Sequence, residues 1–214
     1  MGWIQRGLRR RRVGCLAALV AGAAVAGGCA STSVPEPTYY LMTTTSAGSN
    51  QQLAAEHVVR LAPIELAAYL RGDGIVVQTG ESTVEQARQH RWAEDLASQI
   101  QRDLRRGLAS QLPGVRVVPP RGTLPEAGAP TLSVTVARFQ GRFDGYAVVA
   151  GDWRLCDSEG VTRASGAFYQ EDALGSDGYR ALVASLKAAW AEALGNIASS
   201  LRAQGWRGGA GDSD

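Results

Sequence analysis

The chain of 214 residues predicts an α/β (α+β) two-layer sandwich, in which two long amphipathic helices pack on one largely antiparallel sheet. Three observations predict this class. Apolar residues recur about every four positions in 92–112 and again in 179–201, the spacing of helices with one buried face. Between them, an alternating apolar and polar segment at 132–136 and two further segments at 146–156 and 161–171 are separated by turn sequences, which is typical of an antiparallel meander.

The first 28 residues have the composition of a secretory signal peptide. Residues 1–12 carry five arginines and no acid, and residues 13–28 carry no charge. A basic region followed by an apolar region and small residues is typical of such signals. The apolar run of 16 residues is shorter than the roughly 20 that span a hydrocarbon core, so a retained transmembrane helix is the weaker alternative.

The end of this segment, Ala26-Gly27-Gly28-Cys29, resembles a bacterial lipobox. Small residues leave the backbone accessible to a membrane protease, and the thiol of Cys29 is the nucleophile that accepts a diacylglyceryl group. We therefore predict cleavage between Gly28 and Cys29 and a covalent lipid on Cys29. The alternative is an ordinary A-x-A-type cleavage, which would leave Cys29 as an unmodified thiol.

A lipid on Cys29 predicts a domain that is tethered to a membrane without crossing it, because several acyl chains together make dissociation negligible. Residue Ala30, in place of an aspartate, favours sorting to the periplasmic face of the outer membrane in lipoproteins of Gram-negative bacteria. We expect residues 29–37 to form the lipidated N-terminus and a short spacer, 38–204 a single domain, and 205–214 a flexible tail.

The composition of the predicted mature chain excludes some classes of partner. Removing the five arginines of the signal from the 22 basic residues leaves 17 against 20 acidic residues, a formal charge of about −3, and this argues against nucleic acid. Of the three cysteines, Cys15 leaves with the signal and Cys29 carries the lipid, so only Cys156 remains. No disulfide within the chain is then expected, and the fold must depend on its core.

The N-terminal half of the domain predicts strands followed by the first long helix. We expect strands at 39–42, at 57–66 with Pro63 at an edge or at the end of the pairing, and at 75–78. The capping box Ser82–Glu85 is predicted to begin the helix, and Pro113-Gly114 to end it. Its apolar stripe consists of Trp92, Leu96, Ile100, Leu104, Leu108 and Leu112.

The C-terminal half predicts the meander and the second helix. A strand at 115–118 and a loop at 119–130 precede the meander, whose turns are Asp144-Gly145 and residues 157–160. The second helix ends at Gly205. Its stripe consists of Tyr179, Leu182, Val183, Leu186, Trp190, Leu194, Ile197 and Leu201.

The residues that usually carry chemistry are scarce. Histidine occurs only at His57, before a strand, and at His90, which we place on the first helix, and both are predicted to be surface residues. No His-x-x-His or Cys-x-x-Cys spacing is present, so we predict no metal site. Cys156 is expected to be a buried or half-buried thiol rather than a nucleophile. We expect no enzyme, and no cofactor other than the covalent lipid on Cys29.

Three tryptophans are candidates for either the core or a ligand site. Trp92 and Trp190 lie on the predicted helix stripes, and Trp153 alternates with Leu155 on a strand. Core packing explains all three better than a ligand site does.

The remaining candidates for binding are charged or aromatic. Arg102, Arg105 and Arg106 form a basic patch that is either a solvated helix face or a surface for anionic lipid headgroups or an acidic partner. Phe139 and Phe143, near the first turn of the meander, are weak candidates for an exposed contact with a partner. The residues that bind a partner stay unknown at this stage.

Several segments together resemble the PqiC family, the ABC-type transport auxiliary lipoproteins. These are "YYLM" soon after the lipobox, "VVRLAPIELAAYL", "RWAEDLASQIQRDLRRGL", "GDWRL" and "YRALVASLKAAWAEALGNIASSL". The resemblance runs from Cys29 to about Leu201 and is strongest at residues 91–94. Two departures are Ala67 and Asp95, where the family commonly has proline.

The resemblance implies a role in transport between membranes. Such lipoproteins accompany an MCE-domain protein and an ABC transporter or multi-pass permease that move lipids, and they act as outer-membrane docking elements. A homo-oligomeric ring and some contact with phospholipid would suit this role, and no catalytic residue comes with the family. The alternative function is an outer-membrane lipoprotein that activates a periplasmic enzyme such as a peptidoglycan synthase, and a hydrolase is a weaker third option.

Overall fold

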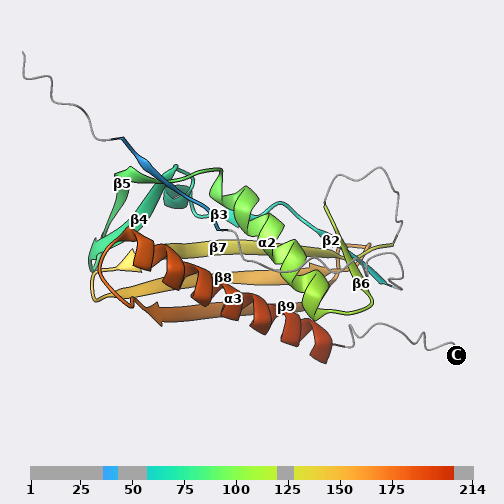
Figure 1. Cartoon of the computed structure of the whole chain (residues 1–214). Helices are drawn as coiled ribbons and strands as arrows, with labels where there is room; N and C mark the ends of the chain where they lie inside the picture. Colours follow the sequence, from blue (N-terminus) through green and yellow to red (C-terminus); the bar gives the residue numbers. More distant parts are fainter. Residues whose placement is uncertain (1–35, 43–56, 120–127, 205–214) are drawn as a thin grey trace, which may run out of the picture. The chain divides into compact units, whose positions relative to one another are not determined.

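A nine-stranded sheet and two long helices organise the domain (Figure 1). The structure is a computed structural model that describes residues 36–42, 57–119 and 128–204, all within a compact unit that runs from Glu36 to Asp214. The predicted signal peptide, the lipidated Cys29, nearly all of the spacer, most of the 119–130 loop and the predicted tail lie outside the described residues.

The first half of the domain is made of short strands and one hairpin. The predicted strand at 57–66 is interrupted, because Pro63 has no backbone N–H to donate to a ladder. The elements are β1 (Thr38–Tyr40), β2 (His57–Leu61), β3 (Glu65–Leu66), the 3-10 turn η2 (Ala68–Leu70), β4 (Gly74–Gly80) and β5 (Thr83–Trp92).

The second half contains both helices and the meander. The second helix begins at Tyr179, as its apolar stripe predicts, and ends at Ala203, just before Gly205. The elements are α2 (Leu96–Gln111), β6 (Val115–Val118), β7 (Thr131–Arg142), β8 (Tyr146–Cys156), β9 (Thr162–Ala173) and α3 (Tyr179–Ala203).

The sheet is mixed. The long pairings of β7 with β8, of β8 with β9 and of β4 with β5 are antiparallel, as the alternation and the turn sequences predict for the meander. The short pairings of β1 with β5, of β2 with β6 and of β7 with β2, β3 and β4 are parallel. The sheet is therefore antiparallel within the meander and within the β4–β5 hairpin. It is parallel where β7 pairs with β2, β3 and β4.

The first helix begins later than predicted. Residues 83–92 form β5, and Asp95 caps α2, because its Oδ1 accepts a hydrogen bond from the backbone N–H of Ser98 at 2.8 Å. The prediction that Ser82–Glu85 caps the helix is therefore wrong, and Trp92 lies at the end of a strand. The sequence "TVEQARQH" favours a helix by composition, but pairing with β4 and β1 decides its conformation.

Both helices pack on one face of the sheet (Figure 1). Gly107 of α2 allows a close approach to α3, since a Cβ there would lie 2.3 Å from Leu194 Cδ1. The side chain of Trp190 is fully buried and contacts Phe168 of β9 edge to face, with ring centroids 6.1 Å apart. The core thus lies between the helices and the sheet, and strands outside the meander, such as β2, β4 and β6, also contribute buried residues to it.

Within the described part of the chain, the helices are too short or too polar to cross a membrane.

Candidate functional site: an apolar pocket at the start of α3

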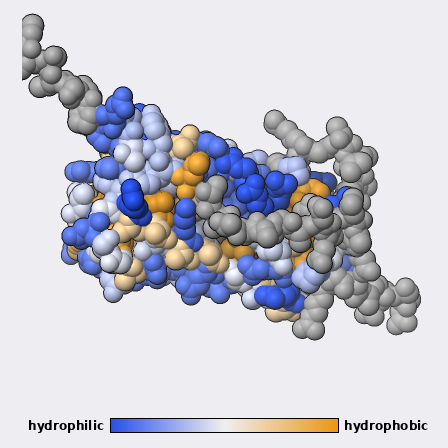
Figure 2. All heavy atoms as spheres, in the orientation of Figure 1, coloured by the Kyte–Doolittle hydropathy of each residue, from blue (hydrophilic) through white to orange (hydrophobic). Residues whose placement is uncertain are grey.

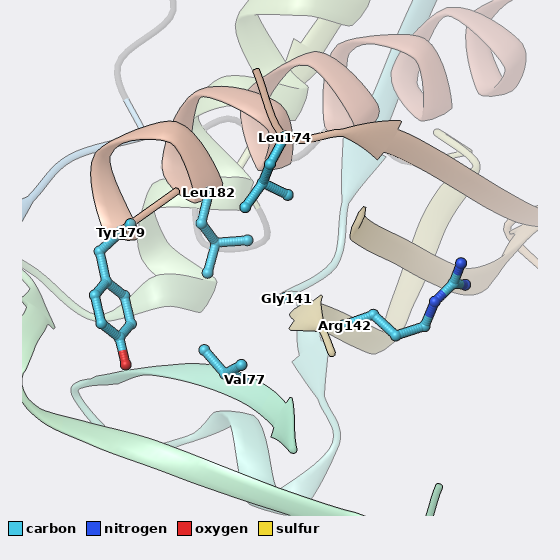
Figure 3. Close-up of a pocket in the computed structure, with 7 residues that line it drawn as sticks. Val77, Gly141, Arg142, Leu174, Tyr179 and Leu182 are labelled. Carbon is cyan, nitrogen blue, oxygen red and sulfur yellow. The ribbon is translucent and has the colours of Figure 1, made fainter. Parts of the chain in front are cut away.

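An apolar pocket of about 230 Å³ opens where α3 begins, beside the middle of β4 and the end of β7 (Figure 3). Its walls come from β4, from β7, and from the loop after β9 together with the first turn of α3. Figure 3 shows Val77, Leu174 and Leu182 directed into the same space, with the ring of Tyr179 closing one side. The lining residues are Val77, Gly141, Arg142, Leu174, Gly178, Tyr179 and Leu182.

Two glycines shape the pocket. At Gly141 a Cβ would lie 3.0 Å from Leu182 Cδ2, so a larger residue on β7 would press against the helix. At the N-cap of α3, Gly178 has a φ of 98°, a backbone conformation that glycine adopts without strain. This turn brings Leu174 and Leu182 to the same cavity.

The Tyr179 side of the pocket is supported by two other aromatic residues. The ring of His90 on β5 stacks on Tyr179 with centroids 4.0 Å apart, and His90 Nδ1 lies 3.1 Å from the hydroxyl of Tyr40 on β1. Burial raises the pKa of the Tyr179 phenol, and the nearby Glu85 carboxylate and Tyr40 raise it further. Tyr179 is therefore a neutral, fixed wall at physiological pH.

The opposite side is formed by the aliphatic stem of Arg142, whose guanidinium points away from the pocket (Figure 3). Nε of Arg142 donates to Asp144 Oδ1 at 2.6 Å, and Nη1 donates to Glu171 and, at 3.3 Å, to the Tyr169 hydroxyl. The guanidinium also lies 5.2 Å from the ring centre of Tyr146. These contacts keep the charge outside and leave an apolar lining.

The Arg142 group also fixes the charge state of its partners. Hydrogen bonds from Arg142 and then from Tyr169 hold the pKa of Glu171 below its usual value. The pKa of Asp144 is lowered first by its hydrogen bond from Arg142. Both groups are therefore carboxylates at neutral pH.

One exposed aromatic residue projects beside this group. The turn between β7 and β8 presents Phe143, whose surface is 58% exposed. In the visible part of the helix-bearing face, apolar and hydrophilic residues are interspersed (Figure 2). The side chains of Tyr146 and Tyr169, which contact the Arg142 guanidinium, are exposed as well, so aromatic surface is gathered near this end of the meander.

Of the two phenylalanines predicted to be exposed near the first turn of the meander, one is exposed and the other is buried. Phe143 is exposed, whereas Phe139 is only 1% exposed, so the prediction that Phe139 contacts a partner is wrong. A register shift between Val136 and Arg138 turns the next residue of β7 toward the helices, and Phe139 packs edge to face against Trp92.

The tryptophan prediction is confirmed. Trp92, Trp153 and Trp190 are all buried in the core, although Trp92 reaches it from a strand and not from a helix.

The remaining predicted residues lie away from the pocket or on its rim. His57 begins β2, and Cys156 is half-buried at the end of β8, 3.8 Å from the Thr162 hydroxyl. His90 is half-buried on β5, so its predicted place on a helix is wrong. The predicted basic patch is partly neutralised, because Arg102 pairs with Glu94.

The arrangement offers contact surfaces for binding. Among the described residues, no group of three or more His, Cys, Asp or Glu side chains is placed to hold a metal ion. Sequence analysis did not find the pocket, because Val77, Gly141, Leu174 and Leu182 share no motif and are joined only by the fold. Gly28 and Cys29 lie outside the described residues.

The structure therefore shows a small α+β domain with one apolar pocket at the start of α3 among its described features. Comparison with known families gives its relationship: the profile described as "ABC-type transport auxiliary lipoprotein component" matches residues 39–198. The chain belongs to this family, as its sequence motifs predict.

Individual relatives agree with this assignment. The chain is 29% identical over 176 residues to the intermembrane transport lipoprotein PqiC of Escherichia coli, covering 82% of this chain and 91% of the relative. PqiC of Shigella flexneri matches to the same extent.

Two crystal structures share the fold. One, of a protein described only as uncharacterized, is 30% identical with a TM-score of 0.67, covering 78% of this chain and 99% of the other. A protein from Xanthomonas campestris is 16% identical with a TM-score of 0.66, over 78% of this chain and 96% of the other, and it shows the fold alone.

Proposed function

We propose that this chain is a non-catalytic docking component of an intermembrane lipid transport system, tethered to the periplasmic face of the outer membrane. Its partners in this proposal are an MCE-domain protein and an ABC transporter or multi-pass permease. The observation that carries the proposal is the family match across residues 39–198, together with the similarity to PqiC, which is named an intermembrane transport lipoprotein.

The tether is proposed from the sequence around Cys29. Residues 30–37 extend by at most about 3.5 Å each, or roughly 28 Å in all. A domain on so short a spacer stays near its own membrane, so a partner that crosses the periplasm has to come to it. A conduit that reaches the outer membrane would do so.

The size of the pocket supports docking over the carriage of a whole lipid. Its volume of about 230 Å³ is below the roughly 300–1,000 Å³ of sites that enclose a small molecule. A phospholipid with two acyl chains would contact such a site only in part. A homo-oligomeric ring, which would surround the end of a conduit, is a further element of this proposal.

A crosslinked pull-down of the full-length protein from membranes, analysed by mass spectrometry, tests the proposal. We expect recovery of an MCE-domain protein. Recovery of a peptidoglycan synthase without an MCE-domain protein would contradict transport and favour the enzyme-activator alternative. Turnover of an ester or peptidoglycan substrate by the purified protein would contradict the non-catalytic role.

A further inference from the structure

We propose that the apolar pocket at the start of α3 receives one apolar side chain of a partner protein, presented on a segment that carries Lys or Arg beside it. This inference rests on the proposed function, because it names the chemistry by which the docking component would hold its partner. Interfaces commonly obtain most of their affinity from one or two such anchors in a desolvated pocket.

The volume of the pocket fits one side chain. An apolar cavity of about 150 Å³ is large enough to hold benzene, and this pocket measures about 230 Å³. It therefore accommodates a leucine or an aromatic side chain, and it is too small for a folded element.

The walls of the pocket are held in place before any partner binds. Leu182 is buried in the core on α3, Tyr179 is stacked on His90, and the guanidinium of Arg142 is bonded to Asp144 and Glu171 outside the cavity. A preformed site loses little conformational entropy when a side chain enters it.

The charges near the pocket favour basic residues on either side of the partner side chain that enters it. Glu85 is the cross-strand partner of Val77, and its charge acts on the Tyr179 phenol at the pocket wall. Asp172 and Asp177 lie in the segment that carries Leu174. Within residues 172–182, which carry the lining residues Leu174, Tyr179 and Leu182, these two carboxylates are accompanied by one basic residue, Arg180.

This excess of negative charge complements a basic segment. Arg142 is already engaged by Asp144 and Glu171, so the charges next to the lining residues along the chain or across the β4–β5 pair are those of Glu85, Asp172 and Asp177 against Arg180. Charge complementarity of this kind attracts a basic partner and disfavours an acidic one. The same charges disfavour anionic phospholipid headgroups.

A photo-crosslinking experiment tests the inference with defined probes. The full-length lipidated protein in phosphatidylcholine nanodiscs is irradiated with acetyl-Lys-Lys-photoleucine-Lys-Lys-amide, and the labelled residues are mapped by mass spectrometry. We expect labelling of the segments that contain Val77, Leu174 and Leu182. The matched peptide with four glutamates should label them about fivefold less, since each exposed charge contributes up to about 1 kcal/mol.

Variants separate the pocket from the rest of the surface. Val77→Trp fills the cavity from β4 and should reduce labelling about tenfold, whereas Thr79→Trp, on the exposed part of the same strand, should leave it unchanged. The double variant Glu85→Gln, Asp177→Asn should reduce labelling without touching the core. Glu192→Gln, at an exposed position of α3, is its control.

Three results of the labelling experiment would overturn the inference. These are equal labelling by the acidic peptide, labelling that Val77→Trp does not reduce, and labelling of the pocket by a photoreactive short-chain phosphatidylcholine but by neither peptide. If an MCE-domain protein is recovered equally with wild type and Val77→Trp, the pocket assignment fails and the proposed function stands. Pocket labelling combined with recovery of a peptidoglycan synthase alone would instead overturn the proposed function.

Discussion

Arg142 performs two roles through different parts of one side chain. Its aliphatic stem lines the pocket. Its guanidinium forms ion pairs with Glu171 of β9 and with Asp144 in the turn between β7 and β8, and so links the end of β7 to both. An arginine suits this position, because its planar group can satisfy several acceptors at once while its stem remains apolar.

The Arg142 group predicts a pH-dependent contribution to stability. The pKa of Glu171 is lowered in the folded protein, first by the hydrogen bond from Arg142, so the stabilisation is full above the ordinary carboxylate pKa of about 4.3. It is lost as the pH falls through the lowered folded value. Arg142→Met should therefore reduce the free energy of unfolding more at pH 7 than at pH 3, as measured by urea denaturation.

The control for this prediction is Arg154→Met, which replaces an exposed arginine on the neighbouring strand. It should cause little change at either pH. An Arg142→Met deficit of the same size at pH 3 and pH 7 would contradict the assigned role of the ion pairs.

Gly151 is a second residue whose identity the fold requires. It pairs with Val136 at the irregularity of β7, and a Cβ there would lie 2.0 Å from the carbonyl oxygen of Thr135. Gly151→Ala should lower the free energy of unfolding by about 2–3 kcal/mol through this clash. At Gly175, an added Cβ would meet no atom within 4 Å apart from its neighbours along the chain. Gly175→Ala should therefore be close to neutral in the same thermal or urea unfolding measurement.

At the scale of elements, the beginning of α2 gives a direct comparison between two capping sites. Asp95→Ala removes the bond to the Ser98 N–H and should cost about 1 kcal/mol of unfolding free energy. Ser82→Ala, at the hairpin between β4 and β5, should change it by less than about 0.5 kcal/mol. A larger loss for Ser82→Ala than for Asp95→Ala would contradict the observed start of the helix.

Elements with strong local periodicity could be predicted from sequence. The stripe of α3 and the turn sequences that separate the strands of the meander depend on neighbouring residues, and the helix and the antiparallel pairing that they predict are both confirmed. The strand β5 could not be predicted, because its polar residues favour a helix until β4 and β1 pair with it. Phe139 was placed wrongly because one irregularity in β7 changes which face the following residues occupy.

The pocket could not be predicted for a related reason. Val77, Gly141 and Leu182 come together only after β4 has paired with β7 and α3 has packed across both. Each residue alone fits an ordinary strand or helix. The lipobox-like sequence and the family motifs are each continuous in sequence, so they could be recognised without the fold.

At the scale of the whole molecule, the proposed function combines a lipid tether with a docking domain. Family membership is shown across residues 39–198, and the proposed lipid on Cys29 would keep that domain near the outer membrane. With so short a spacer, the proposed tether would also determine where the domain can meet a partner. Loss of the lipid should therefore weaken partner recovery without unfolding the domain.

The most direct measurement is a crosslinked pull-down from cells that express either the full-length protein or Cys29→Ala, with separation of the outer membrane beforehand. We predict that the wild-type protein is found in the outer membrane and recovers an MCE-domain protein. Cys29→Ala should leave that fraction and recover much less of the partner. Equal outer-membrane retention and equal recovery with both forms would contradict the tethered docking component.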